Sequence, residues 1–417
     1  MSFRRRLLRY ATSSFAGGVV SKLGPSVVGL LLIHLVARGE DTLDDVGRLT
    51  LATATAYLCG SLAEMGMMTS LSLPQKYFGV PSPPLRATRN ARWLAACAGS
   101  TLYGALWLAG LGAHEPILLL ALPFPFLLAL SYGYIGAMNA GGALTAEGKI
   151  TTGEAAVTLA ATLLLAQATS VLAAALLALS VARALGLVAR LLVLQPLPKH
   201  EGTAVHGVVR QQLWFLASSG AIVLHGRLEV LVLGFAPNFT LLGVYGTLLR
   251  ACYSTFLVAE GLTLAMYSTD ETRSSSRAVR RWRVTGLVIG LVAGGAFLVA
   301  AGPLLPVILD RPIEHLLVPI VLLAVLIPVR FAGYVQSVDL VRGGRQAARI
   351  PVLALALVVL LAGGLVGWQT ESLTWLSAFR LGSEAVVTLG FLYLARRWFA
   401  GSRRARPEAS PVGSIEG

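Results

Sequence analysis

Long apolar runs, separated by short polar clusters, follow one another through nearly the whole chain of 417 residues. A helix needs about 20 mostly apolar residues to cross a hydrocarbon core of roughly 30 Å, so we divide the chain where polar, proline or glycine clusters interrupt such a run. The division predicts twelve membrane-spanning helices, at residues 12–36, 46–72, 93–111, 116–138, 151–169, 171–194, 211–235, 241–266, 284–305, 313–338, 350–368 and 373–395.

The fifth and sixth spans lie in one almost continuous apolar stretch, from Thr151 to Leu194. A single helix of that length would be roughly 66 Å long, about twice the thickness of the hydrocarbon core. Gln167, Thr169 and Ser170 are the polar residues in the middle of the stretch. We therefore predict that the chain reverses direction near Gln167.

The charged residues between the spans alternate from loop to loop. One set of alternating loops and both ends of the chain hold nearly all of the loop lysines and arginines, whereas the other set holds only Arg38, Arg48 and Arg311. Acidic residues gather in this second set, at Glu40, Asp41, Asp44, Asp45, Glu115, Asp310, Glu314 and Glu371. Because cytoplasmic loops carry the excess of Lys and Arg, both termini are predicted to lie in the cytoplasm.

A weak internal repeat relates the two halves of the chain. At an offset of 196 residues, Gly47, Tyr57, Ala63, Glu64 and Ser72 fall on identical residues without a gap. An offset of six spans preserves orientation, so the halves would be parallel repeats related by an axis along the membrane normal. The predicted fold is all-α and membrane-integral, with two parallel six-helix bundles around a central cavity. The predicted domains are a lobe at 1–194, a cytoplasmic linker at 195–210, a second lobe at 211–396 and a cytoplasmic, disordered tail at 397–417.

Composition narrows the function. The chain is 55% hydrophobic and 13% charged, whereas soluble domains carry roughly 25% charged residues. The net charge of +14 lies in loop clusters rather than in a basic stripe with exposed aromatics, so we expect the bilayer, and not a nucleic acid, as partner. The stretch from Gly142 to Lys149 lacks phosphate-loop spacing, and the six histidines lack metal-site spacing. We therefore predict no ATP hydrolysis, no metal and no cofactor.

Ionisable residues within the predicted spans are the main candidates for a site. Such a group costs roughly 3 kcal/mol or more at the helix centre if it faces lipid, so it should face a cavity or a partner. The candidate cavity cations are Lys22, Arg183, Arg227, Arg250 and Arg330. Internal ion pairing is the alternative for Arg183, for Arg190, for His225 with Glu229 and for the i, i+4 pair of Arg380 with Glu384. We expect six buried cations against few buried acids, which leaves a positive interior that an anionic substrate could neutralise.

Glu64 and Glu260 are equivalent under the repeat and form the second set of candidates. A carboxylate at membrane depth has a raised pKa and could carry a coupling proton. Pairing with a neighbouring arginine would explain each of them equally well. Two glycine series, at Gly286, Gly290 and Gly294 and at Gly363 and Gly367, have the spacing of close helix packing.

This layout resembles the polysaccharide flippase branch of the multidrug/oligosaccharidyl-lipid/polysaccharide exporter superfamily. The resemblance rests on twelve spans, internal termini, two parallel halves, and the openings of spans 2 and 8 at Gly47 and at Gly243 to Tyr245. The stretch from Arg227 to Tyr245, with Leu-Val-Leu-Gly, a short outer loop and Leu-Gly-Val-Tyr, is similar to the start of that family's second lobe.

The resemblance implies two bundles in a V around a cavity that opens alternately to either side of a membrane. It further implies transport of undecaprenyl-pyrophosphate-linked sugars, with cavity cations binding the pyrophosphate, a use with which Lys22, Arg227 and Arg250 are compatible. The related drug exporters tend to carry a cation-binding acid on the first helix of a half. Lys22 stands in span 1 without an acid, which favours the lipid-linked sugar branch.

We therefore expect a non-enzymatic flippase in a bacterial cytoplasmic membrane that moves a lipid-linked oligosaccharide for polysaccharide synthesis, alongside polysaccharide-assembly proteins. The first alternative is an ion-coupled antiporter of cationic drugs, which would depend on Glu64 or Glu260. The second is a membrane polymerase or glycosyltransferase, a class that usually needs acids in a sizeable outer loop, whereas the outer loops predicted here are short.

Overall fold

The computed structural model describes residues 24–38, 42–64, 89–140, 143–194, 217–236, 238–256, 259, 276–310, 312, 314–342 and 346–404. Within these ranges the chain is helical and contains no strand, and each of the twelve predicted spans includes a helical segment. The predictions made at Lys22, at Glu260 and for the linker at 195–210 lie outside the described residues.

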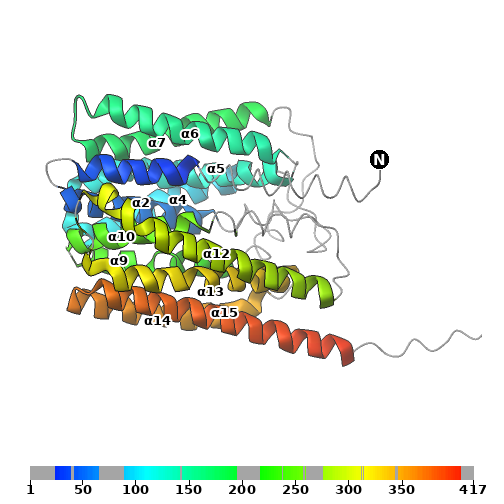
Figure 1. Cartoon of the computed structure of the whole chain (residues 1–417). Coiled ribbons are helices and arrows are strands. Elements are labelled where there is room, and N and C mark those ends of the chain that lie inside the picture. Colours follow the sequence, from blue (N-terminus) through cyan, green and yellow to red (C-terminus); the bar gives the residue numbers. More distant parts are fainter. Residues whose placement is uncertain are drawn as a thin grey trace, which may run out of the picture.

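The N-terminal lobe comprises the described helices before residue 195. They are the helix Gly24–Ala37, α2 (Thr42–Ala63), α4 (Arg89–Leu108), α5 (Pro123–Ala140), α6 (Leu144–Leu165) and α7 (Val171–Val193), with short 3-10 turns at Leu111–His114 and Pro116–Ala121. α6 packs mainly against α7, and α7 packs against α5, so these helices form one side of the lobe (Figure 1).

The C-terminal lobe comprises the described helices after residue 216. They are the helix Ala217–His225, α9 (Leu228–Gly234), α10 (Phe239–Ser254), α12 (Ser276–Leu309), α13 (Leu317–Arg342), α14 (Arg349–Thr370) and α15 (Leu373–Arg404), with 3-10 turns at Glu314–Leu316 and Gln346–Ala348. α13 packs against both α12 and α15, and α14 packs against α15 and α9. The fold therefore consists of two helical bundles, one from each half of the chain.

Six described helices are long and apolar enough to cross a membrane. They are Pro116–Met138, Val171–Val193, Arg283–Leu309, Leu317–Val338, Arg349–Thr370 and Leu373–Arg397. A seventh crossing is formed if Ala217–His225 and Leu228–Gly234, which meet at a bend of 60°, count as one span. Exposed leucines and valines cover the outer faces of α7, α12 and α14, which is the surface expected of helices that face lipid.

The predicted reversal near Gln167 is confirmed. α6 ends at Leu165, and α7 begins at Val171. The hydroxyl of Ser170 accepts a hydrogen bond from the amide of Ala173 at 3.2 Å, so it caps the start of α7. Several helix boundaries differ from the prediction, among them the start of α12, which lies at Ser276 and not at 284. α6 begins at Leu144, seven residues earlier than predicted, and α15 continues to Arg404, past the predicted boundary at 396, because no proline interrupts the chain between them.

The glycine series pack as predicted. A Cβ atom on Gly290 would lie 2.8 Å from the backbone of Pro328, and one on Gly294 would lie 2.7 Å from the carbonyl oxygen of Ala324. These contacts bring α12 against α13. Gly363 and Gly367 face Phe379 and Leu376 in the same way and bring α14 against α15. The small residues therefore allow close approach of neighbouring helices.

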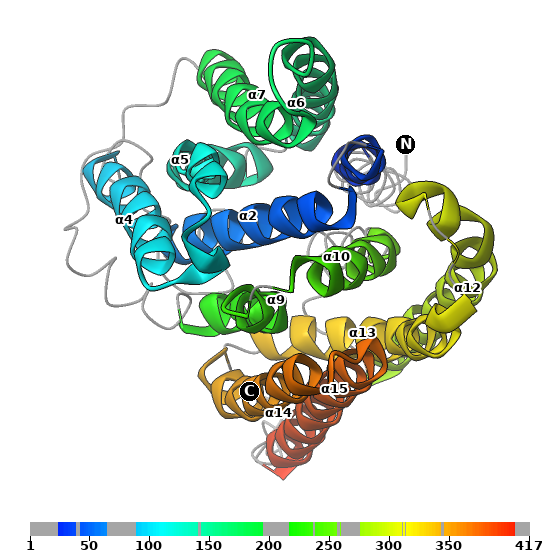
Figure 2. The ribbon, with the colours of Figure 1, turned by 90° about the vertical axis from the view of Figure 1, so that its left-hand side faces the viewer.

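α2 and α10 cross at the centre of the molecule and join the two lobes (Figure 2). We call the contact between residues 43–50 of α2 and residues 239–246 of α10 the seam. A Cβ atom on Gly243 would lie 3.0 Å from the backbone nitrogen of Gly47, and the hydroxyl of Thr240 donates a hydrogen bond to Asp44, which lies 196 residues earlier. Residues that are equivalent under the predicted repeat therefore face each other across the seam.

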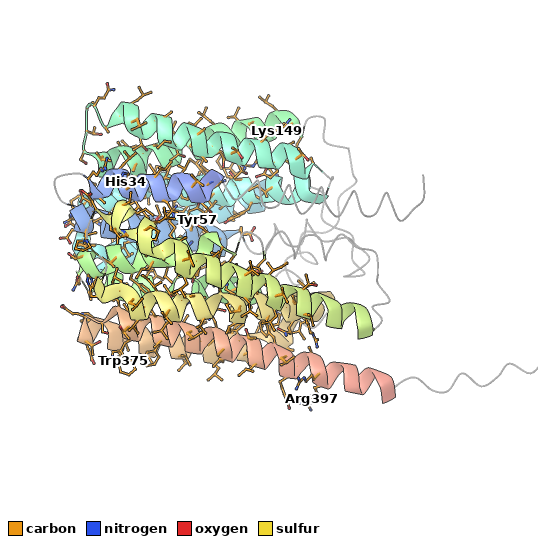
Figure 3. All side chains as sticks on the ribbon, in the orientation of Figure 1. His34, Tyr57, Lys149, Trp375 and Arg397 are labelled. Carbon is orange, nitrogen blue, oxygen red and sulfur yellow. The ribbon has the colours of Figure 1, made fainter. Side chains whose placement is uncertain are left out.

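The predicted outer loops meet at one end of the molecule. Arg48 bonds to Glu115 at 3.1 Å, and Asn238 bonds to Glu371 at 3.1 Å, so acidic residues from several of these loops gather there. Figure 3 shows His34 and Trp375 toward this end, with Lys149 and Arg397 toward the opposite end and Tyr57 between them. The described loops thus alternate between two ends, as the charge pattern predicts.

Candidate functional site

A buried charge network lies between α6 and α7 in the N-terminal lobe. Arg190 is fully buried and donates to Glu147 through Nη2 at 2.6 Å and through Nε at 2.9 Å. Its Nη1 also bonds to Glu154, whose other oxygen lies 3.1 Å from Arg183. We call Glu147, Glu154, Arg183 and Arg190 the N-terminal quartet. Because arginine is always charged and each carboxylate faces an arginine, this quartet has no net charge.

A second network lies within the C-terminal lobe. Arg380 of α15 is fully buried and donates to Glu229 of α9 at 3.0 Å and to Glu384 at 3.0 Å. Arg330 of α13 donates to the same oxygen of Glu384 at 2.8 Å. We call Glu229, Glu384, Arg330 and Arg380 the C-terminal quartet, and it too has two cations and two anions. The predicted pair of Arg380 with Glu384 is confirmed.

Arg380 also binds both helical segments of the broken seventh span. The helix Ala217–His225 ends at the break, and α9 starts at Leu228 with Arg227 as its N-cap residue. Such a break frees backbone carbonyls at membrane depth, where no water is at hand to satisfy them. The guanidinium of Arg380 donates to the carbonyl oxygen of His225 on one side of the break and to Glu229 on the other. The two pieces of the span are therefore tied to α15.

His225 and Glu229 are not on one continuous helix, because the break lies between them. The Nε2 atom of His225 lies 2.7 Å from the hydroxyl of Ser383, and Nδ1 lies 3.8 Å from Glu384. The hydroxyl of Tyr245 donates to Glu229 at 3.2 Å. Each side chain thus has partners within the network, and the structure does not bring the two into an ion pair.

Arg330 sits among aromatic rings. Its guanidinium carbon lies 4.9 Å from the ring centroid of Tyr253, 4.7 Å from that of Phe256 and 5.6 Å from that of Tyr334. Cations are attracted to aromatic faces within about 6 Å. Together with Glu384, these rings enclose Arg330, whose side chain is 17% exposed. Arg330 is therefore a paired cation.

Arg227 and Arg250 form a different kind of group, which we call the seam pair. Arg250 is on α10, and Arg227 is the N-cap residue of α9, a helix that packs against α10. In the described part of the chain, neither arginine has a carboxylate within ion-pair distance. The seam pair thus carries two positive charges that the described acids do not neutralise.

Arg250 lies near the middle of the span. It is eleven residues from Phe239 at the start of α10, and a rise of 1.5 Å per residue places it roughly 16 Å along the helix. Two cations at such depth are costly if they remain uncompensated. Their position between the lobes makes them the best candidate in the described chain for contact with an anionic ligand.

The predicted site residues therefore fall into three groups. Arg227 and Arg250 lie on neighbouring helices, α9 and α10, and Arg250 reaches the N-terminal lobe at Gly29, whereas Arg183 and Arg330 each bind a glutamate and lie in separate lobes. Glu64 is buried at the end of α2 and has a partner. Lys22 and Glu260 are outside the described residues.

Sequence reasoning missed Glu147 and Glu154, which supply the negative charge of the N-terminal quartet. A signal for them was present, because Glu147 and Glu154 are seven residues apart, as are Arg183 and Arg190 on the next helix. Residues seven apart share a helix face, so two antiparallel helices with such spacings can align both pairs. The expectation of few buried acids is corrected here, since four glutamates are buried among the cations.

No protein family model matches the chain, and no curated protein matches it. Solved structures do match over nearly its full length. One match is to the outward-facing conformation of a multidrug resistance MATE family transporter of the MOP superfamily. It has a TM-score of 0.73 at 11% identity and covers 97% of this chain and 100% of that transporter.

The chain has the fold of the MATE transporters. The eukaryotic MATE transporter AtDTX14 matches with a TM-score of 0.66 at 16% identity, covering 96% of this chain and 99% of its own. A MOP superfamily transporter from Pyrococcus furiosus matches with a TM-score of 0.70 at 11% identity, and the match covers 97% of this chain and 99% of that transporter. The binding pocket of that transporter is described as having a reverse polarity that suggests a different function. The predicted fold, twelve helices in two bundles, is therefore confirmed.

The fold agrees with the six long apolar helices of the described residues in indicating a multi-pass membrane protein. Similar structures include transporters of the MOP superfamily, the superfamily of the predicted resemblance. The names of the similar structures fit the drug-antiporter alternative better than the flippase branch. At identities of 11–16%, the similarity itself concerns the fold, and the substrate has to be argued from the site.

Proposed function

We propose that this chain moves an anionic amphiphile across a membrane by alternating access, with a lipid-linked pyrophosphate oligosaccharide as its substrate. The observation that carries the proposal is the seam pair, Arg227 and Arg250. Arg183, Arg190, Arg330 and Arg380 are each paired with a glutamate, whereas no described carboxylate lies within ion-pair distance of Arg227 or Arg250. A pyrophosphate would supply the missing counter-charge through charge-assisted hydrogen bonds.

In this mechanism the two lobes rock about the seam while the headgroup binds to the C-terminal lobe. The lipid tail stays in the bilayer, and the sugar passes between the lobes. We place the protein in the cytoplasmic membrane of a bacterium, with both termini in the cytoplasm and with polysaccharide-assembly proteins as partners. A reporter that is active only outside the cytoplasm, fused after Asp45, Asn238 or Pro312, should give a signal at all three positions; silence at any one would overturn the topology.

Binding by the full chain in lipid nanodiscs tests the substrate. We expect polyprenyl-pyrophosphate sugar to bind to the native chain and a neutral polyprenyl sugar not to bind. Arg250→Gln or Arg227→Gln should weaken binding about tenfold or more, the loss of one charge-assisted hydrogen bond. Arg397→Gln, which removes an exposed arginine at the basic end, serves as the matched control. Equal binding of the charged and neutral lipids would overturn the proposal.

An ion-coupled multidrug antiporter is the second candidate, and the similarity to MATE multidrug transporters favours it. In that mechanism a carboxylate exchanges a coupling ion for a cationic drug. Drug resistance of cells that express the chain should then fall with Glu64→Gln or Glu260→Gln and should persist with Arg250→Gln. The same three variants, assayed for lipid-linked sugar transport, would show the opposite order under the first proposal.

A further inference from the structure

The guanidinium of Arg250 rests against the backbone of the helix Gly24–Ala37 at Gly29. Gly29 is buried, and a Cβ atom placed on it would lie 2.3 Å from Nη2, 2.4 Å from Nε and 2.5 Å from Cζ of Arg250. All three distances are shorter than any contact between real atoms of these types. The arginine head therefore occupies the volume that any other residue at this position would fill with its side chain.

This contact joins the two lobes. Gly29 belongs to the first helix of the N-terminal lobe, and Arg250 belongs to α10 of the C-terminal lobe. Under the repeat, the counterpart of Arg250 is Ala54 of α2, a buried small residue. Because Gly29 has no side chain, the N-terminal lobe offers space where the C-terminal lobe supplies a cation.

Arg250 is held at this place by shape rather than by an opposite charge. No carboxylate among the described residues lies within ion-pair distance of it, whereas its guanidinium fills the space beside Gly29. A guanidinium has five N–H donors in a rigid fork and suits a phosphate in a two-point arrangement. An arginine fixed by packing keeps those donors for a ligand, whereas one fixed by a glutamate, such as Arg380, does not.

We infer that Gly29 is a positioning residue that seats Arg250, so that the anion site is assembled across the lobe interface. The inference deepens the proposed function and rests on it for the identity of the ligand, a phosphate or pyrophosphate group. Since the seat and the cation belong to different lobes, the site is complete only while the helix Gly24–Ala37 lies against α10. Anion binding therefore favours that arrangement of the lobes, and by linkage the arrangement favours binding.

Gly29→Ala tests the packing of Arg250 against Gly29 without removing any charge. The added methyl group displaces the flexible end of Arg250, so we expect the affinity of the full chain in nanodiscs for inorganic pyrophosphate to fall about tenfold. Gly24→Ala is the matched control on the same helix, because its Cβ atom would meet Thr152 at an ordinary 3.4 Å. We expect affinity in that variant to stay within about twofold of the native value.

A double-mutant cycle decides whether Gly29 acts through Arg250. In an Arg250→Gln background, Gly29→Ala should cause no further loss of pyrophosphate affinity. An equal loss in both backgrounds would show that the alanine acts through general packing, and it would overturn the positioning role. Unchanged affinity of the single variant Gly29→Ala would overturn it as well.

A measurement without ligand separates this inference from the proposed function. In a chain whose exposed Cys97 is replaced by serine, the pair Gly29→Cys and Arg250→Cys should be joined by a short bifunctional thiol reagent, and the pair Gly24→Cys and Arg250→Cys should not. If the native chain binds no pyrophosphate but the first pair of cysteines is cross-linked, the proposed substrate is wrong and the contact between Gly29 and Arg250 is confirmed. If the first pair is not joined, the seat itself is wrong.

Discussion

The C-terminal quartet and the seam pair show two ways in which one lobe holds arginines at membrane depth. Arg330 and Arg380 share two glutamates and are enclosed by aromatic rings and polar groups. Arg227 and Arg250 have no such partner among the described residues. A neutral network stabilises a particular packing of helices, whereas an uncompensated pair stores unfavourable energy that a ligand can release. The number of buried arginines is thus a poor guide to the site, and their pairing is a better one.

The C-terminal quartet should show the largest effect on stability. Arg380→Met leaves Glu229 buried without a cation, because Glu384 keeps Arg330, and breaking a buried pair in this way costs about 3–5 kcal/mol. We expect a marked fall in the thermal unfolding temperature of the detergent-purified chain. The double variant Arg380→Met with Glu229→Gln restores the charge balance and should recover more than half of the loss; no recovery would show that shape, and not charge, dominates.

The N-terminal quartet should respond in the same direction and by less. Arg190→Met leaves Glu147 unpaired while Arg183 still binds Glu154, and we expect about 3 kcal/mol of destabilisation. We expect the smaller loss of unfolding free energy because α6 packs mainly against α7, so the lost contacts are confined to the α6–α7 hairpin. Unfolding followed by tryptophan fluorescence, with Arg190→Met and Glu147→Gln combined as the charge-balanced control, measures the difference. A larger effect here than at Arg380 would reverse the comparison.

The seam should be sensitive to a single methyl group. In Gly47→Ala the new Cβ atom would lie 2.0 Å from the carbonyl oxygen of Phe239, and because backbone cannot rotate away, the helices must separate at a cost of about 1–3 kcal/mol. Gly295→Ala, on α12, meets no atom within 4 Å and should be neutral or stabilising. Equal unfolding temperatures for the two variants would contradict close packing at the seam.

The seam pair should show the smallest effect on stability and the largest on binding. Arg250→Gln removes a cation that no described carboxylate pairs with, so we expect a change of less than about 1 kcal/mol in unfolding free energy, in either direction. Pyrophosphate affinity, measured on the same preparation, should fall about tenfold or more. A stability loss as large as that of Arg380→Met would place Arg250 in a structural network and remove it from the site.

Sequence periodicity predicts most of this fold, because the bilayer imposes it. The apolar run length, the charge of the loops and the reversal near Gln167 each follow from a local physical requirement, and each agrees with the described helices. The glycine series could be predicted for the same reason, since spacing within one helix determines which residues share a face.

The pairing of charges could not be predicted in the same way. Arg330 and Glu384 are 54 residues apart, and Arg190 and Glu147 are 43 apart, so their contact depends on which helices pack together and at what rotation. The seat of Arg250 depends on a glycine in another lobe, where no side chain offers a signal. Contacts within one helix can be inferred from spacing, but contacts between helices need the packing.

The facing of equivalent residues across the seam has an evolutionary consequence. Two identical copies of an ancestral half would carry the same residue at both equivalent positions, and so they could offer only two alanines or two arginines at the positions of Ala54 and Arg250. Once both copies belong to one gene, each can diverge alone. A single substitution in one half then places a positive charge in one lobe and not in the other. A symmetric homodimer of the same helices could not have this asymmetry.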